Sequence, residues 1–355
     1  MEGLSKLYEG AGEGIVVFSA VGVESLLGSG GDASKRVSFK VPVFKLRECR
    51  VEAGILSIGI TTPNTVRPPF KWKLEMEGFT VSREFKPQLS VSLEDSTYHK
   101  ALYDVKPLVS SSRYAGMGSY TLRALYDSAH PIFLREASLM IVYSKAGLKH
   151  SASYMSGLVV LEPGGEYTVK LSLPEDVGGD RIAYLTLMLP SPKSVLNISS
   201  GVDEAEIVGP GFRLAEVKAP RDQTVTIKVS YAQPQMKIYP RKALITGVLL
   251  VENALPTPRL EASVESVEEL ADKVKIKVSV ANMGEEAAEE VQIILRHAGI
   301  NVKEVKLGVI EPGETVQTLL EVDKPRLPSK PQKLSLRLKW AKNDIESSKI
   351  LDVNL

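Results

Sequence analysis

Cysteine is nearly absent from this chain, since Cys49 is the only one in 355 residues. A single cysteine cannot form a disulfide within the chain, and the metal sites that are built from several thiolates are excluded as well. Arg47 and Arg50 flank Cys49, but no motif of a catalytic cysteine surrounds it, and we interpret it as a residue at a strand end. Asparagine and glutamine are also scarce, with seven of each beside many Glu, Lys and Val, which is typical of proteins from thermophiles.

Neither sign of charge dominates, because 44 Lys and Arg residues balance 43 Asp and Glu residues to a formal net charge of +1. No global field would attract nucleic acid, so no nucleic-acid partner is expected. Long apolar runs are missing too. The most apolar stretches, 183–189 and 243–251, are far shorter than the roughly 20 residues of a membrane-spanning helix, and no transmembrane segment is expected.

The first residues, Met1 to Lys6, lack the apolar run and cleavage site of a secretion signal. Their sequence favours a cytoplasmic location.

What the sequence does contain is alternation of apolar and polar residues, which is the period of a half-buried strand. Val37–Val41, Trp72–Met76 and Leu89–Leu93 alternate in this way, and Gly, Pro or Asn residues punctuate such segments along the chain. A sustained helical period is hard to find. We predict an all-β protein whose first 254 residues form a jelly-roll-like region of two sandwiches, residues 1–146 and 147–254.

Pro256 and Pro258 mark the best candidate for a linker, at residues 255–258, because two prolines one residue apart hold a chain extended. Residues 259–355 contain seven further alternating segments, the number of strands in an immunoglobulin-like sandwich. We therefore predict a third, immunoglobulin-like domain there.

The last domain carries a family resemblance in three segments, one of which is the apolar strand segment Val291–Leu295. Val278–Gly284 ends a strand in Asn-x-Gly, and Leu307–Thr315 contains the turn Glu-Pro-Gly-Glu before another strand. In these segments the domain resembles CARDB, the cell-adhesion-related domain of bacteria and archaea. The resemblance implies an immunoglobulin-like fold and a role in adhesion.

The N-terminal region is similar to archaeal and bacterial surface β domains of unknown function. Tyr103–Val105, Gly118–Thr121 and Ala137–Tyr143 carry that similarity. It implies a position at the cell surface, whereas the missing signal favours the cytoplasm, and both locations stay open.

No catalytic residue and no cofactor are predicted. The four histidines, His99, His130, His150 and His297, lack the short paired spacing of a metal site. Acidic residues cluster at Glu175, Asp176 and Asp180, where carboxylate oxygens suit calcium, although a solvated turn explains the cluster as well.

Aromatic residues are the remaining candidates for a binding surface. Twelve tyrosines and two tryptophans are present, and a rigid ring with a polar tip suits contacts with glycans or proteins, although core packing explains such residues equally well. The candidates for a binding surface are Trp72, Tyr98, Tyr103 and Tyr126.

The sequence favours a non-enzymatic protein-interaction or structural protein, acting on a protein partner or by self-association. Two alternatives stay open, namely a protein that binds or processes carbohydrate and a cytosolic scaffold or assembly factor.

Overall fold

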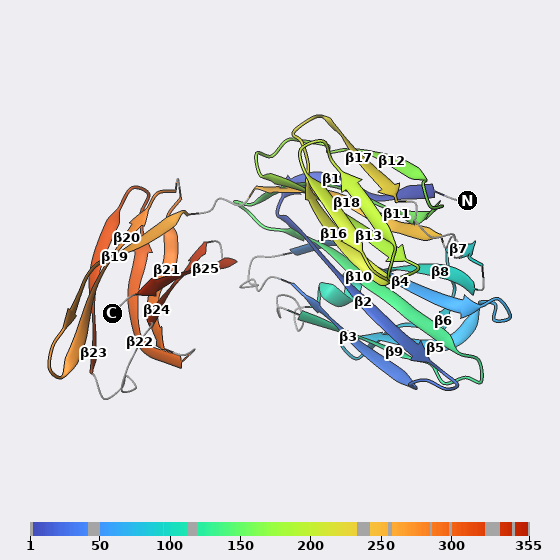
Figure 1. Ribbon diagram of the computed structural model, residues 1–355, viewed down its shortest axis with the longest axis horizontal. Helices are drawn as coiled ribbons and strands as arrows, with labels where there is room; N and C mark the ends of the chain where they lie inside the picture. Colours follow the sequence, from blue (N-terminus) through green and yellow to red (C-terminus); the bar gives the residue numbers. More distant parts are fainter. Residues whose placement is uncertain are drawn as a thin grey trace. The chain divides into compact units, whose positions relative to one another are not determined.

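The computed structural model describes residues 3–41, 50–94, 96–111, 119–232, 242–254, 258–284, 286–297, 300–323, 334–342 and 345–353. These residues form 25 strands and one short helix, α1 (Lys106–Val109), which confirms the all-β sandwich fold. The chain divides into two compact units, Met1–Leu255 and Pro256–Leu355 (Figure 1). Within the described ranges, no helix has the length and apolar character needed to cross a membrane.

Two antiparallel sheets make up the first sandwich of the N-terminal unit. The five-stranded sheet has the order β2 (Ile15–Leu27), β10 (Ile132–Ser144), β4 (Arg50–Pro63), β8 (Ser96–Asp104) and β7 (Leu89–Ser92). The four-stranded sheet has the order β3 (Ser34–Lys40), β9 (Ser119–Leu125), β5 (Phe70–Met76) and β6 (Phe79–Phe85).

The second sandwich of this unit is built in the same way. Its five-stranded sheet has the order β1 (Gly3–Glu13), β11 (Lys149–Leu161), β18 (Ala243–Ala254), β13 (Asp180–Leu189) and β16 (Gly211–Lys218). Its four-stranded sheet has the order β12 (Glu166–Ser172), β17 (Thr224–Tyr231), β14 (Val195–Ser199) and β15 (Glu204–Val208). Strand β1 thus pairs with the second sandwich, although it precedes the first in sequence.

The two sandwiches share one topology. If β1 and β7 are set aside and the strands of each sandwich are numbered along the chain, both five-stranded sheets read 1-8-3-6 and both four-stranded sheets read 2-7-4-5. Two four-stranded sheets connected in this order make a jelly roll. The unit is therefore a pair of jelly rolls, each with one additional strand at the edge of its larger sheet.

The larger sheets are covered on both faces. One face of the second roll's sheet packs on its own outer sheet around Leu185, Leu187 and Val248. Its other face meets the larger sheet of the first roll, where Tyr154 and Leu249 share a cluster with Val142. This double burial explains the continuous apolar run of β18, since a strand that is covered on both sides has no solvated face to alternate with.

The C-terminal unit is the immunoglobulin-like sandwich that the seven alternating segments predict. Ile276, Val278, Ile293 and Leu336 lie in its core. One sheet has the order β19 (Leu260–Glu269), β20 (Lys273–Asn282) and β23 (Thr315–Asp323). The other has the order β22 (Ile300–Ile310), β21 (Ala288–His297), β24 (Leu334–Lys342) and β25 (Ile345–Val353). Of the predicted linker 255–258, residues 255–257 lie outside the described residues.

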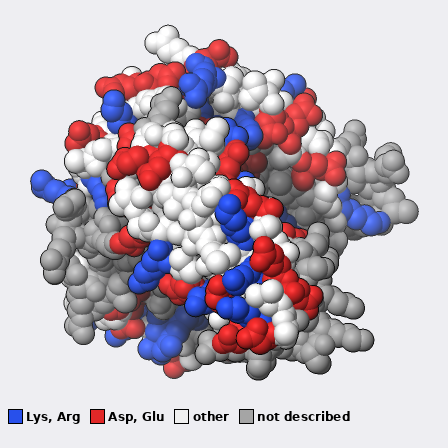
Figure 2. Space-filling model, turned by 90° about the vertical axis from the view of Figure 1, so that its left-hand side faces the viewer, with Lys and Arg blue, Asp and Glu red and all other residues white. Residues whose placement is uncertain are grey.

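The surface charges are mixed in sign. On β20, Lys273 and Lys275 both pair with Glu321 of β23, while Lys277 pairs with Glu265 of β19. Figure 2 shows one face of the molecule, on which basic and acidic side chains are interspersed. Charges of both signs at close spacing leave no field of a single sign over this face.

Candidate functional site

A pocket of about 360 Å³ opens between the two jelly rolls and is the main candidate for a functional site. The first roll contributes mostly polar side chains to it, from β2, β4, β8 and β10. The second roll contributes mostly apolar side chains from β13 and β18 and from the turn before β16. The lining residues that matter below are Glu24, Thr61, Ser96, Arg135, Met188 and Leu244.

The two charged residues at the centre of the pocket, Glu24 and Arg135, lie in one β-bulge. The β2–β10 ladder loses its regular register between Leu134 and Glu136, which leaves Arg135 outside the regular pairing. Across the ladder, Glu24 has a φ of 43°, in the left-handed region that non-glycine residues rarely occupy. Bulges of this kind redirect side chains and are common next to binding sites.

Hydrogen bonds fix both side chains. Arg135 donates from Nη1 to Glu24 at 2.6 Å and from Nε to the Thr61 hydroxyl at 3.1 Å. The other oxygen of the Glu24 carboxylate accepts the backbone N–H of Phe212, on the second roll, at 3.0 Å. The guanidinium lies 4.0 Å from the centre of the Phe133 ring. The pair is therefore held from both rolls, and it remains partly exposed, with 29% of Arg135 and 37% of Glu24 accessible.

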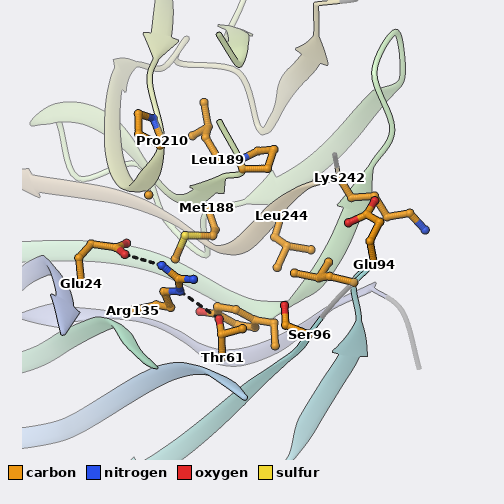
Figure 3. A pocket seen from close by; sticks show the side chains of 14 residues that line it. Glu24, Thr61, Glu94, Ser96, Arg135, Met188, Leu189, Pro210, Lys242 and Leu244 are labelled. Carbon is orange, nitrogen blue, oxygen red and sulfur yellow. Dashed lines mark hydrogen bonds and ion pairs between the residues drawn. The ribbon is translucent and has the colours of Figure 1, made fainter. Parts of the chain in front are cut away.

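Figure 3 shows the opposite wall, where Met188 and Leu244 face Arg135 and Thr61. The pocket thus joins an apolar surface to a surface that offers hydrogen-bond donors and acceptors. This combination suits a small ligand that carries both hydroxyl groups and apolar faces.

A buried polar cluster lies behind the pocket and joins the rolls. Tyr98, which is fully buried, donates from its hydroxyl to Glu136 at 2.8 Å, and Thr246 of the second roll donates to the same carboxylate at 3.1 Å. The ammonium of Lys100 lies 3.8 Å from that carboxylate and donates to the backbone carbonyl of Thr246. Desolvation lowers the pKa of Lys100, and it raises the pKa of Tyr98 well above its ordinary value.

Of the aromatic residues singled out in the sequence, Trp72 and Tyr126 lie inside the first roll, Tyr98 lies between the rolls, and Tyr103 is half-buried. Trp72 and Tyr126 are 5% and 3% exposed, and both contact the ring of Phe70, with centroid distances of 6.5 and 5.2 Å. Tyr98 belongs to the buried cluster, and burial raises the pKa of Tyr103 to about 12. The structure brings Trp72 and Tyr126 together as core, and it presents no exposed face made of these four residues.

The acidic residues of the proposed calcium loop have different positions. Asp176 accepts the N–H of Gly178 at 3.0 Å and lies 3.5 Å from Arg181, and both contacts keep the pKa of Asp176 low. The backbone N–H of Glu175 donates to Ser151, and Asp180 begins β13. In the described part of the chain, no group of three or more His, Cys, Asp or Glu residues is arranged to hold a metal.

Among the histidines, His99 is the one whose pKa departs furthest from its ordinary value. His99 is buried, and its ring nitrogens lie 2.7 Å from the Ser90 hydroxyl and 3.0 Å from the Thr62 hydroxyl. Burial lowers its pKa to about 4, too low for an efficient general base near neutral pH. Cys49 lies outside the described residues.

Sequence reasoning singled out Tyr98, which lines the pocket and belongs to the buried cluster, but it missed Glu24, Arg135, Glu136 and Lys100. One signal was available, because Arg135 and Glu136 interrupt the otherwise apolar segment 132–143. Two charges inside a strand that reads as buried indicate a bulge or a buried ion pair.

Comparisons with known proteins give no family. No family model and no curated protein matches the sequence. Among solved structures, a β-glucuronidase of Ruminococcus gnavus aligns with 58% of this chain at 14% identity and a TM-score of 0.23, and the chain spans only 36% of that enzyme.

Two further glycosidase structures are similar at the same low level. A β-glucuronidase 2 of Bacteroides uniformis aligns with 58% of this chain and 26% of its own, at 14% identity and a TM-score of 0.24. The β-glucosidase 3B of Thermotoga neapolitana aligns with 28% of this chain and 16% of its own, at 16% identity and a TM-score of 0.18. Similarities this weak carry no argument about function.

Proposed function

We propose that the protein is non-enzymatic and acts as an interaction or structural protein that binds a protein partner. The observation that carries the proposal is the position of its acid–base groups. Tyr98, Lys100 and His99, whose pKa values are all shifted from the ordinary range by burial, are at most 4% exposed. Catalysis needs such groups within reach of a substrate, whereas these groups join strands and jelly rolls.

The pocket supports the same proposal. The carboxylate of Glu24 is already occupied by Arg135 and by the N–H of Phe212, and Arg135 is also bound to Thr61. These bonds fix the bulge between the rolls.

The C-terminal unit is the part of the chain that supports a role in adhesion. It is an immunoglobulin-like sandwich with its own core, joined to the double jelly roll in one chain. Its resemblance to CARDB supports a role in adhesion or at a cell surface. Rigid sandwiches in series are suited to presenting loops and strand edges to a partner.

The proposal is tested by cross-linking mass spectrometry on native cells that carry the tagged chain. We expect cross-links to one stoichiometric protein partner or to a second copy. A partner in the envelope supports adhesion, and a cytosolic partner supports the scaffold form of the proposal.

The non-enzymatic part is tested with a panel of chromogenic glycosides and esters. Glu24 and Glu94 are the two carboxylates that line the pocket, and we expect the same background rates for the protein and for its Glu24→Gln and Glu94→Gln variants. Turnover that either substitution abolishes would overturn the proposal, because it would make a pocket carboxylate catalytic.

A second candidate function is carbohydrate binding, and the composition of the pocket favours it. The polar side holds Thr61, Ser96 and Arg135, which offer donors and acceptors to hydroxyl groups, and Met188 and Leu244 provide an apolar surface on the other side (Figure 3). Protein sites for small ligands combine a few polar groups with an apolar wall in this way.

Isothermal titration with a library of soluble mono- and disaccharides tests this candidate. Saturable binding that Arg135→Met weakens about tenfold, while the exposed control Arg221→Met leaves it unchanged, would support it. Variants of Trp72 or Tyr98 are unsuitable because both side chains are buried. Absence of binding at millimolar concentrations for all sugars would remove this candidate.

A further inference from the structure

A second cavity, of about 220 Å³, lies at the other end of the interface between the two rolls. Its floor is β13 of the second roll, where Asp180, Ile182 and Tyr184 alternate along the strand and so point to the same side. Its wall is the start of β2, with Val16 and Phe18. None of these residues belongs to the pocket described above.

The cavity combines aromatic rings with one acidic group. The ring of Phe18 lies 5.8 Å from that of Tyr184 and 6.0 Å from that of Tyr154, and the aliphatic side chains of Val16 and Ile182 complete the apolar lining. The side chain of Asp180 is exposed, and within the described residues it makes no hydrogen bond or ion pair. Its carboxylate is therefore free to bind a cation.

The walls of the cavity are fixed by hydrogen bonds between the rolls. Asn253, directly opposite Asp180 in the β13–β18 ladder, accepts the N–H of Val16 through Oδ1 and donates from Nδ2 to the carbonyl of Val16, both at 3.0 Å. These two bonds use one donor and one acceptor of the carboxamide and hold β2 against β18. Phe18, two residues further along β2, is thereby positioned over the floor.

The two residues that flank Asp180 in the chain, Gly179 and Arg181, are held in place by hydrogen bonds to Glu252. Arg181 donates twice to the buried Glu252, at 2.9 and 3.2 Å, and Gly179 donates its N–H to the same side chain at 3.0 Å. Because both flanking residues are fixed, little conformational entropy is lost when Asp180 binds a ligand.

Two charged residues of the adjoining edge strand β16 lie next to the floor of the cavity. Glu216 is directly opposite Tyr184, and Lys218 is directly opposite Ile182. Neither makes an ion pair with Asp180. Asp180 is the charged residue among those that line the cavity, and Glu216 adds a second carboxylate close to Tyr184.

We infer that this cavity binds a lysine side chain of a protein partner. The aliphatic stem fits the lining of Val16 and Ile182, the rings of Phe18 and Tyr184 favour a cation at their faces, and Asp180 supplies the counter-charge at the mouth. The inference rests on the proposed function, since it names the chemistry by which the partner is anchored. Fixed aromatic residues at the centre of a contact are the usual anchors of protein interfaces.

The test is a methyl NMR titration of the full-length protein with two capped tripeptides, acetyl-Gly-Lys-Gly-amide and the same peptide with norleucine in place of lysine. Norleucine keeps most of the apolar stem and lacks the charge. We expect the lysine peptide to shift the methyl signals of Val16, Ile182 and Val251 saturably, and the norleucine peptide to bind about tenfold more weakly. Added salt should weaken the lysine peptide alone.

Matched variants separate charge from shape. Asp180→Asn should reduce the affinity for the lysine peptide to that for the norleucine peptide, and Tyr184→Leu should weaken both peptides. The control Glu206→Gln removes an exposed carboxylate on β15 and should change nothing. The methyl spectra report at the same time whether each variant is folded.

Equal shifts with both peptides, no shifts with either, or an Asp180→Asn variant that binds the lysine peptide normally would overturn the inference. If the cavity fails this test while cross-linking recovers a partner, only the inference about lysine falls. If the lysine peptide binds as expected and no partner or second copy is recovered, the cavity stands and the proposed function falls.

Discussion

At the scale of single residues, the contact between the jelly rolls depends on polar groups that are almost completely buried. Glu136 is 1% exposed and accepts hydrogen bonds from both rolls, through Tyr98 and Thr246, while Lys100 supplies the counter-charge. Removing one partner of such a pair leaves an uncompensated charge in a medium of low polarity. The cluster is therefore more sensitive to single substitutions than the apolar contacts around it.

Glu136→Gln should destabilise the N-terminal unit by about 3–5 kcal/mol, because Lys100 loses its counter-ion and two hydroxyl donors meet a weaker acceptor. Urea unfolding followed by circular dichroism measures the change. Glu166→Gln is the control, since it breaks an exposed pair with Lys228 and should cost less than about 1 kcal/mol. Equal effects of the two substitutions would contradict the role given to the cluster.

The pH dependence of stability should contain a contribution from His99. Its pKa is about 4 in the folded protein and about 6.5 when unfolded, so the unfolded state binds more protons between these values. Stability due to this group is complete above pH 6.5 and is lost as the pH falls toward 4. His150, whose pKa burial also lowers, acts in the same direction.

Thermal unfolding at intervals from pH 7.5 to 4 tests this expectation. In a His99→Gln variant the melting temperature should fall less steeply below pH 6.5 than in the unchanged protein. Parallel curves would show that another group is responsible.

At the scale of elements, the strand β1 forms the edge of the second roll's larger sheet, although it precedes the first roll in the sequence. The chain turns from β1 into β2 at Gly14, which has a φ of 141° and donates its N–H to Leu148 at 2.8 Å. A Cβ atom there would lie 1.8 Å from the carbonyl oxygen of Tyr143. The turn therefore requires glycine.

Gly14→Ala should cost more than about 2 kcal/mol, because the backbone must move and the pairing of β1 with β11 is weakened. Hydrogen exchange of the β1 amides, together with urea unfolding, measures the loss. The control is Gly30→Ala, at a φ of 78° with no atom within 4 Å of the added Cβ, which should cost about 1 kcal/mol through the backbone conformation alone. Unchanged exchange at β1 would contradict this account.

The sequence predicts these elements unevenly. Alternation identifies the strands of the outer sheets and of the immunoglobulin-like unit, because those strands keep one solvated face, as β20 does from Lys273 to Asn282. It fails to show which sheets pack together, since the apolar strand β18 reads the same whether its second face meets a roll or a partner. The pairing of β1 with β11 joins residues that lie about 145 positions apart, which no local pattern encodes.

The candidate sites were harder to predict than the fold. The sequence allows Trp72 and Tyr126 to be either exposed binding residues or core residues. Only the three-dimensional packing shows that they are core residues. From the sequence, Asp180 belongs to an acidic cluster that suits either a calcium site or a solvated turn. The structure separates it from Asp176, because Gly178 and Gly179 turn around the side chain of Glu252 between them.

At the scale of the whole molecule, the chain consists of two units with separate cores. The predicted proline linker at 255–258 coincides with the division between Leu255 and Pro256. The two jelly rolls of the first unit share buried surface, whereas the immunoglobulin-like unit has a core of its own. The two units should therefore unfold as independent cooperative transitions.

Limited proteolysis with a protease of broad specificity should cut first between Ala254 and Arg259 and release a fragment of about a hundred residues. A chain of residues 256–355 made separately should show dispersed NMR signals and a cooperative thermal transition. A fragment that unfolds on release would disprove the independence of the unit.

The repeated strand order has a consequence for the origin of the molecule. The two rolls meet through equivalent sheets, as the subunits of a two-fold symmetric dimer do. Here the last strand of one roll provides Glu136 and the last strand of the other provides Thr246. Equivalent strands thus meet through different side chains, so each roll is fitted to the other and not to a second copy of itself.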